Sequence, residues 1–175
     1  IRQYAYEKLL AAGSEPHIRR RHLIYFLTVT EQAAPELRGP AGVGWLDRLE
    51  AEHDNLRVAF DWALTHHITA ALQLAANLLW FWHIRGHKHE GRDWLHRALA
   101  AEAEARGEQT LDPMHGPIRA QALYVAGFLA QMTADLNQAR ELVQKSLALW
   151  RPLGSAGDQC MAYTLSCLGR IALEQ

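Results

Sequence analysis

The chain has 175 residues, with 18 basic and 19 acidic side chains and a formal net charge of −1 at pH 7. This length is enough for one domain with a sizeable core, and 49% hydrophobic residues is ordinary for a soluble globular protein. The nearly neutral charge excludes an overall field that would attract nucleic acid or an anionic membrane. Cys160 and Cys167 are too far apart for a disulfide within one helix, so we expect reduced thiols and a cytoplasmic protein.

Helical spacing runs through nearly the whole chain, and no segment shows the sustained alternation of a strand. A first helix is predicted to end at the Ala-Gly-Ser of residues 12–14. A second is predicted over "HLIYFLTV" (22–29), where β-rich composition competes but Ile18 and Ala33 extend the helical spacing. The breakers Gly39-Pro40 then precede a third helix.

The stretch "LDRLEAEHDNLRVAFDWAL" (46–64) places carboxylates and an imidazole side by side. A metal site would need three or four converging ligands, and HExxH spacing is missing. We favour a junction between two helices, with His53 facing the core and Asp54 or Asn55 as the N-cap. One unbroken helix is the alternative. The stripe that places His53 inside consists of Leu46, Leu49, His53, Leu56, Phe60 and Ala63.

Residues 68–84, "ITAALQLAANLLWFWHI", are the most apolar segment. At 17 residues with polar interruptions, the segment is too short for a membrane span and predicts a helix buried on most sides. Gly86 is expected to break the helical pattern after it. His83, His87 and His89 are then expected in a solvated turn, with no metal bound.

An internal repeat is the strongest pattern in the sequence. "RGHKHEGRDWLHRAL" (85–99) matches "TADLNQARELVQKSL" (133–147), and "ALYVAGFLAQM" (122–132) matches "YTLSCLGRIALE" (163–174). The second match places Gly127 opposite Gly169. Because glycine weakens a helix, both positions predict close contact with another helix. The first match also predicts a set of core residues: Trp94, Leu95, Ala98 and Leu99.

The spacing of Gly127, then Ala139 after the tight "ADLN" turn, then Pro152 resembles a tetratricopeptide repeat. Over essentially the whole chain, the ordered segments "IRQYAYEKL", "RRRHLIYFL", "PELRGP", "WLDRLEAEHDNLRVAFDWAL" and "GRDWLHRAL" resemble the helical-repeat region of bacterial STAND-class predicted ATPases, which are related to LuxR-type and SARP-type transcriptional regulators. The resemblance implies an all-α fold of antiparallel helical hairpins, stacked as a tetratricopeptide-like right-handed superhelix.

The catalytic part of that class is missing, because no GxxxxGK[ST] phosphate-binding loop occurs. We therefore expect a fragment without catalytic residues, metal or cofactor. Residues 1–40 would link to a missing upstream module, and residues 41–175 would form the repeats, the last one truncated. One continuous domain is the alternative.

The expected function is a non-catalytic interaction or sensor module, which binds a protein or small-molecule signal and contacts other domains of the same regulator. The basic cluster at residues 19–22 is expected to be a solvated or docking face, so neither nucleic acid nor a membrane is an expected partner. The alternative is a metal- or small-molecule-binding helical domain with a catalytic role.

The resemblance also predicts where a partner binds, because in such stacks the first helix of each pair lines the inner, concave surface. Flat apolar side chains and hydrogen-bonding amides suit a recognition groove. Trp80 and Phe128 could instead fill the space between repeats. The candidate residues are Gln73, Trp80, His83, Gln121, Phe128, Gln131, Tyr163 and Arg170.

Overall fold

The computed structural model describes residues 15–105 and 115–174, and every regular element in these ranges is helical. This confirms the predicted all-α class, while the helix expected before residue 12 lies outside the described residues. No helix within these ranges is long and apolar enough to cross a membrane. The elements are α2 (Glu15–Glu36), α3 (Gly42–Ala51), α4 (His53–His66), α5 (Ile68–Asn77), α6 (Leu79–Ile84), α7 (Lys88–Ala105), α8 (His115–Met132), α9 (Leu136–Trp150), the 3-10 helix η1 (Arg151–Gly157) and α10 (Asp158–Glu174).

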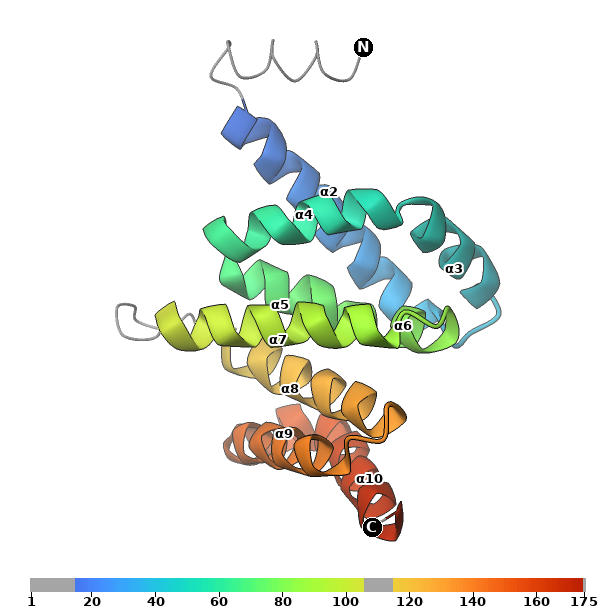
Figure 1. Ribbon diagram of the computed structural model, residues 1–175, viewed down its shortest axis with the longest axis vertical. Helices are drawn as coiled ribbons and strands as arrows, with labels where there is room; N and C mark the ends of the chain where they lie inside the picture. The colour runs from blue at the N-terminus through green and yellow to red at the C-terminus, as the bar shows by residue number, and fades with distance from the viewer. Residues whose placement is uncertain (1–14, 106–114, 175) are drawn as a thin grey trace.

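The helices follow one another along the long axis of the molecule, from α2 at one end to α10 at the other (Figure 1). Helix α8 lies centrally and packs against α5, α7 and α9, while α10 packs mainly against α9. Helix α2 crosses behind α4 and also packs on α5. Each helix therefore buries an apolar stripe against a neighbour, as amphipathic helices must in a layered α structure.

One buried cluster joins the whole stack, from Leu23 of α2 to Ile171 of α10. The residues before position 41 thus share a core with those after it. Trp94, Leu95 and Ala98 are buried as predicted, and Leu99 packs against the cluster while partly buried. The repeat match therefore identified core positions on α7.

The turns that precede α7 and α9 each contain a residue with positive φ. Gly86 has φ of 85° before α7, and Ala134 has φ of 62° before α9. The two residues occupy equivalent places in the matched segments 85–99 and 133–147. Since positive φ is uncommon for a non-glycine residue, its recurrence at matched positions supports the equivalence of the two turns.

Gly127 and Gly169 differ, although the repeat predicted close contact at both. A Cβ built on Gly127 would lie 2.5 Å from Cγ2 of Val143 and 3.1 Å from the Ala139 carbonyl oxygen, so α8 and α9 touch there. A Cβ on Gly169 would meet nothing within 4 Å. The expectation for Gly169 is wrong among the described residues, because α10 buries a different face through Cys167 and Ile171.

The apolar segment 68–84 is buried as expected, but it forms two helices rather than one. Helix α5 ends at Asn77, α6 begins at Leu79, and Leu78 between them has φ of −88° and ψ of 11°. The indole N–H of Trp82 donates a 3.0 Å hydrogen bond to the Ala75 carbonyl. In a continuous helix the Leu79 N–H would donate to the Ala75 carbonyl. Because the Trp82 indole donates to that carbonyl instead, it stabilises the break between the two helices.

Candidate functional site

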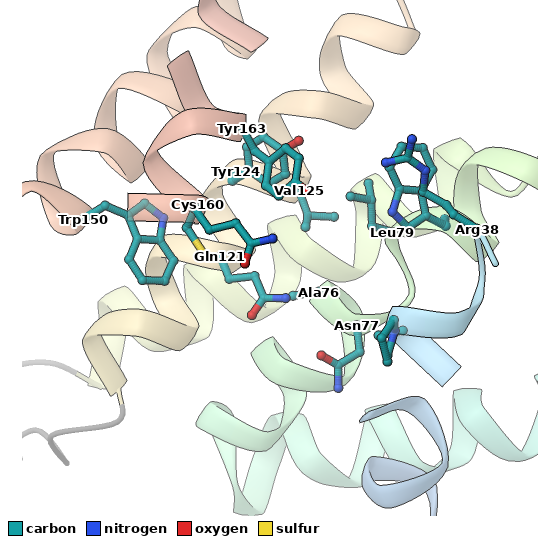
Figure 2. A pocket seen from close by; sticks show the side chains of 14 residues that line it. Arg38, Ala76, Asn77, Leu79, Gln121, Tyr124, Val125, Trp150, Cys160 and Tyr163 are labelled. Carbon is teal, nitrogen blue, oxygen red and sulfur yellow. The ribbon is translucent and has the colours of Figure 1, made fainter. Parts of the chain in front are cut away.

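The most suitable binding feature of the described residues is a pocket of about 660 Å³ lined by residues of α2, α5, α6, α8, α9 and α10 and by Arg38 after α2. Its size is within the range of roughly 300–1,000 Å³ common for small-molecule sites. Figure 2 shows Arg38 and Trp150 at opposite ends, with Gln121, Tyr124 and Tyr163 between them. The lining residues are Ala34, Pro35, Arg38, Ala76, Asn77, Leu79, Trp80, Gln121, Tyr124, Val125, Trp150, Gln159, Cys160 and Tyr163.

The pocket combines flat apolar walls with hydrogen-bond donors. The Arg38 guanidinium carbon lies 4.5 Å from the centre of the Trp80 ring, within cation–π distance. Burial raises the pKa of Tyr124 to about 12, so its phenol stays protonated at neutral pH. The lining also carries the amide side chains of Gln121 and Asn77. Such a surface can hold a ligand by stacking and by directional hydrogen bonds.

Three of the eight residues predicted from the sequence line this pocket. Trp80 of α6 is partly buried, while Gln121 of α8 and Tyr163 of α10 are exposed. Tyr163 keeps 50% of its surface accessible. They come from three different helices, α6, α8 and α10.

Three more predicted residues form an aromatic and cationic cluster beside Trp80. Phe128 is only 4% exposed, and its ring centre lies 5.7 Å from that of Trp80 and 5.8 Å from that of His83. The Arg170 guanidinium lies 5.4 Å from the Phe128 ring centre. Phe128 therefore packs between neighbouring helices, while Trp80 belongs to both the cluster and the pocket.

The remaining two predicted residues make polar contacts elsewhere. Gln131 is buried and donates a 2.8 Å hydrogen bond to Glu174, which ties α8 to α10. Gln73 donates a 2.6 Å hydrogen bond to Glu31, which ties α5 to α2. Neither residue is among those that line the pocket.

Sequence reasoning missed Arg38, Tyr124 and Trp150. Arg38 follows α2, outside the matched repeats, and Trp150 ends α9, the second helix of a matched pair. Tyr124 carried a usable signal, because it precedes Phe128 by one helical turn and its ring centre lies 6.3 Å from that of Phe128. The other two join the pocket through packing between distant segments.

The stretch at residues 50–55 is a junction between helices, as predicted. Helix α3 ends at Ala51 and α4 begins at His53. The predicted N-cap was wrong, because Glu52 occupies that place without a side-chain cap bond. His53, the first residue of α4, is already buried against the core. Asn55 instead donates a 2.7 Å hydrogen bond to Glu52.

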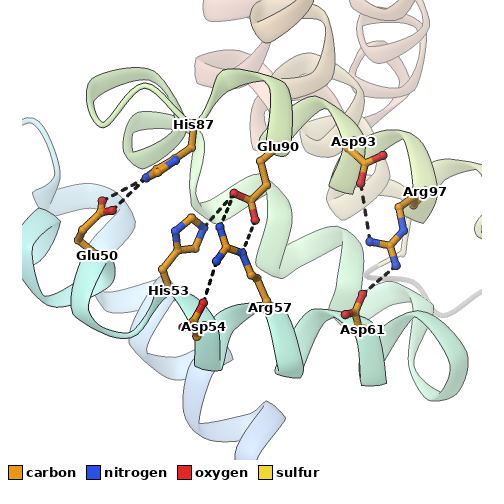
Figure 3. Close-up of polar contacts among 9 residues, drawn as sticks. All are labelled: Glu50, His53, Asp54, Arg57, Asp61, His87, Glu90, Asp93 and Arg97. Atoms are coloured by element: carbon orange, nitrogen blue, oxygen red, sulfur yellow. Dashed lines mark hydrogen bonds and ion pairs between the residues drawn. The ribbon is translucent and has the colours of Figure 1, made fainter.

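Polar side chains then connect α4 with α7 (Figure 3). Arg57 donates two hydrogen bonds to Glu90, of 2.7 and 2.9 Å, and a third of 2.7 Å to Asp54. Further along the same helices, Arg97 donates a 2.7 Å hydrogen bond to Asp61. The bidentate pair fixes orientation as well as distance, so it aligns the two helices.

His53 lies inside this connection. It is 5% exposed, and its Nε2 is 3.4 Å from a Glu90 oxygen, without a hydrogen-bond partner among the described residues. Burial lowers the pKa of His53, although the Glu90 charge opposes that effect. The folded state therefore favours the neutral imidazole of His53, which packs against Phe81 and His87.

His87 was expected in a solvated turn, but it returns to α3. Its Nε2 lies 3.1 Å from a Glu50 oxygen. Glu50, His53 and His87 each bring one potential metal-ligand atom within 4.8 Å of the others. Figure 3 shows His53 between His87 and Glu90, so Glu50 pairs with one imidazole and Glu90 with the other. We interpret the group as a polar connection between helices.

A second buried ionic group joins α7 and α8. Glu102 is 3% exposed, lies 2.8 Å from Nε2 of His115 and accepts a 3.0 Å hydrogen bond from Arg119. Thr69 of α5 contacts the other ring nitrogen of His115 at 3.2 Å. Glu102 could have been found from the sequence, because it extends the stripe of Leu95 and Ala98.

Comparison with known proteins links this chain to regulators of transcription. It is 32% identical over 172 residues to proteins from Mycobacterium tuberculosis and Mycobacterium bovis whose names describe them as candidate HTH-type transcriptional regulators. The match covers 94% of this chain but only 18% of each relative. No protein-family model matches, and no solved structure does. The chain is thus similar to one part of much longer regulators.

Proposed function

We propose that this chain is a non-catalytic helical-repeat module of a larger transcriptional regulator, and that it binds a protein or small-molecule signal on its inner face. The observation that carries the proposal is the pocket lined by Trp80, Gln121 and Tyr163, which belong to the three helices α6, α8 and α10. The similarity to the mycobacterial proteins supports the regulatory context.

A tetratricopeptide-like, right-handed stack is the architecture that we propose for the module. The equivalent turns at Gly86 and Ala134 and the contact of Gly127 with Val143 support it. Repeated helical pairs of this kind create extended concave surfaces suited to binding. The resemblance to STAND-class regulators gives the remaining context, in which binding here would control modules elsewhere in the protein.

A non-catalytic role agrees with the chemistry of the pocket. Its lining has no histidine, aspartate or glutamate, the side chains that most often act as acids and bases. Burial also raises the pKa of its one thiol, that of Cys160, which disfavours the nucleophilic thiolate. Ligand recognition needs neither an acid–base residue nor a thiolate, because stacking surfaces and amide groups can bind a ligand.

The test is signal-dependent transcription from a reporter gene by the full-length regulator carrying Gln121→Trp. Gln121 is exposed in the pocket, so the larger ring fills the site without entering the core. We expect loss of the response to the signal while basal DNA binding is retained.

Gln144→Trp is the matched control, because Gln144 is equally exposed on α9 and lies outside the pocket. It should leave the response unchanged. A normal response from Gln121→Trp, or equal losses from both variants, would contradict the proposed function.

A further inference from the structure

The pocket carries a single charge, and it is positive. Arg38 is its single ionic residue, and no aspartate or glutamate is among the lining residues. No carboxylate pairs with Arg38 within the described part of the chain, where its guanidinium lies over Trp80. A stacked guanidinium is weakly hydrated and keeps its fork of N–H donors available for a carboxylate.

The opposite end of the pocket holds a buried donor that lacks an acceptor. Trp150 is 6% exposed, and its indole Nε1 has no hydrogen-bond partner among the described residues. Buried indole N–H groups usually find a partner, because leaving one unpaired costs free energy. The nitrogen itself has almost no accessible surface, so an acceptor atom on a bound molecule reaches it only when the surrounding side chains shift.

Aromatic rings make up much of the pocket wall. Trp80, Tyr124 and Tyr163 present aromatic rings from three helices, and Figure 2 shows the two tyrosines between the Arg38 and Trp150 ends. Aromatic walls favour a planar ligand, because rings gain from stacked and edge-to-face contacts. The protonated phenol of Tyr124 adds another donor rather than a negative charge.

Building on the proposed function, we infer that the pocket binds a planar organic anion, an aryl or heteroaryl carboxylate. Its carboxylate pairs with Arg38, its rings lie among the aromatic side chains, and an acceptor at its far end faces Trp150. A cationic ligand would meet Arg38 without a compensating carboxylate. A ligand without acceptors would leave the Trp150 N–H unpaired.

The inference is tested with three compounds that share one ring system and differ in charge: 6-methoxy-2-naphthoate, the corresponding amide and the corresponding aminomethyl cation. Each is titrated into the chain while the indole N–H resonances are followed by NMR. Trp150→Phe identifies the Trp150 signal by its disappearance. We expect the carboxylate to bind about tenfold more tightly than the cation, since an Arg–carboxylate pair is charge-assisted, and to shift the Trp150 resonance.

Arg38→Gln should remove most of the preference for the anion. Arg48→Gln is the matched control, because Arg48 also lies over an indole, 5.2 Å from the Trp45 ring centre, but outside the pocket. It should keep the preference. Trp150→Phe should weaken binding of the carboxylate.

Similar affinities for all three compounds, or tighter binding of the cation, would overturn the anionic class while leaving the pocket as a binding site. No shift of the Trp150 signal with any compound would overturn the inference altogether. The proposed function would still be decided separately, by the response of Gln121→Trp in the reporter experiment.

Discussion

Gly86 and Ala134 both have positive φ, 48 residues apart, in the turns that lead into α7 and α9. Glycine adopts this conformation without strain, whereas alanine does so at a cost of about 1–2 kcal/mol. The matched geometry therefore persists where the residue does not favour it, which supports a true structural repeat.

The first prediction follows from this pair. Ala134→Gly should raise the free energy of unfolding by about 0.5–1 kcal/mol, because relief of strain outweighs the added freedom of the unfolded chain. Gly86→Ala should lower it by about 1 kcal/mol through the reverse effect. Denaturant unfolding of both variants measures whether the free energy of unfolding rises or falls in each. A destabilised Ala134→Gly would show that the turn at Ala134 is not strained.

The second prediction compares two glycines at matched repeat positions. Gly127→Ala should destabilise the chain by about 1–3 kcal/mol, because the new methyl group would press on Val143 and the Ala139 backbone. Gly169→Ala should instead stabilise it by up to about 1 kcal/mol, since the position is open and alanine favours a helix. Equal changes in the unfolding midpoint would contradict the different packing of α8 and α10.

The sequence allowed prediction of those features that depend on local periodicity. The all-helical class, the core residues Trp94 and Leu95 and the junction before His53 all follow from spacing along one helix or between matched helices. The break at Leu78 does not, because neither glycine nor proline marks it and the stabilising indole of Trp82 arrives from the next helix.

The candidate site was predictable only in part, for the same reason. Trp80, Gln121 and Tyr163 were predicted because each lies on the first helix of a matched pair, Gln121 and Tyr163 at equivalent repeat positions and Trp80 at another. Arg38 and Trp150 join them through packing of segments that share no period. The contact of His87 with Glu50 likewise spans 37 residues and leaves no local pattern.

The third prediction concerns pH. Burial lowers the pKa of His53, so the unfolded chain, with a histidine pKa near 6.5, binds more protons than the folded chain just below that pH. Stability must then fall as the pH drops through and below 6.5. His22 and His83 have pKa values lowered mainly by burial and act in the same direction.

Denaturant unfolding at about pH 7.5 and about pH 5.5 measures this loss of stability. His53→Gln should show a smaller loss between the two conditions than the parent chain. The exposed His89 provides the control, and His89→Gln should lose as much stability between the two pH values as the parent chain. Equal or greater stability at the lower pH would contradict a neutral, buried His53.

The fourth prediction is that the purified chain does not hydrolyse ATP. It contains no GxxxxGK[ST] segment whose backbone N–H groups could hold the phosphates. Phosphate release should equal that of a buffer control at every concentration of the purified chain. Turnover that scales with the chain and disappears after a single substitution within it would show that a catalytic site had been missed.

Occupancy of the pocket in the full-length regulator is the most direct test of the proposed role. A photo-reactive benzoylphenylalanine placed at Gln121, in the pocket, is compared with the same group at Gln144, exposed on α9 outside it. After irradiation under conditions that activate transcription, mass spectrometry detects the adducts. We predict a signal-dependent adduct at position 121 and none at position 144. No adduct at 121, or equal labelling at both positions, would contradict binding of a signal at this face.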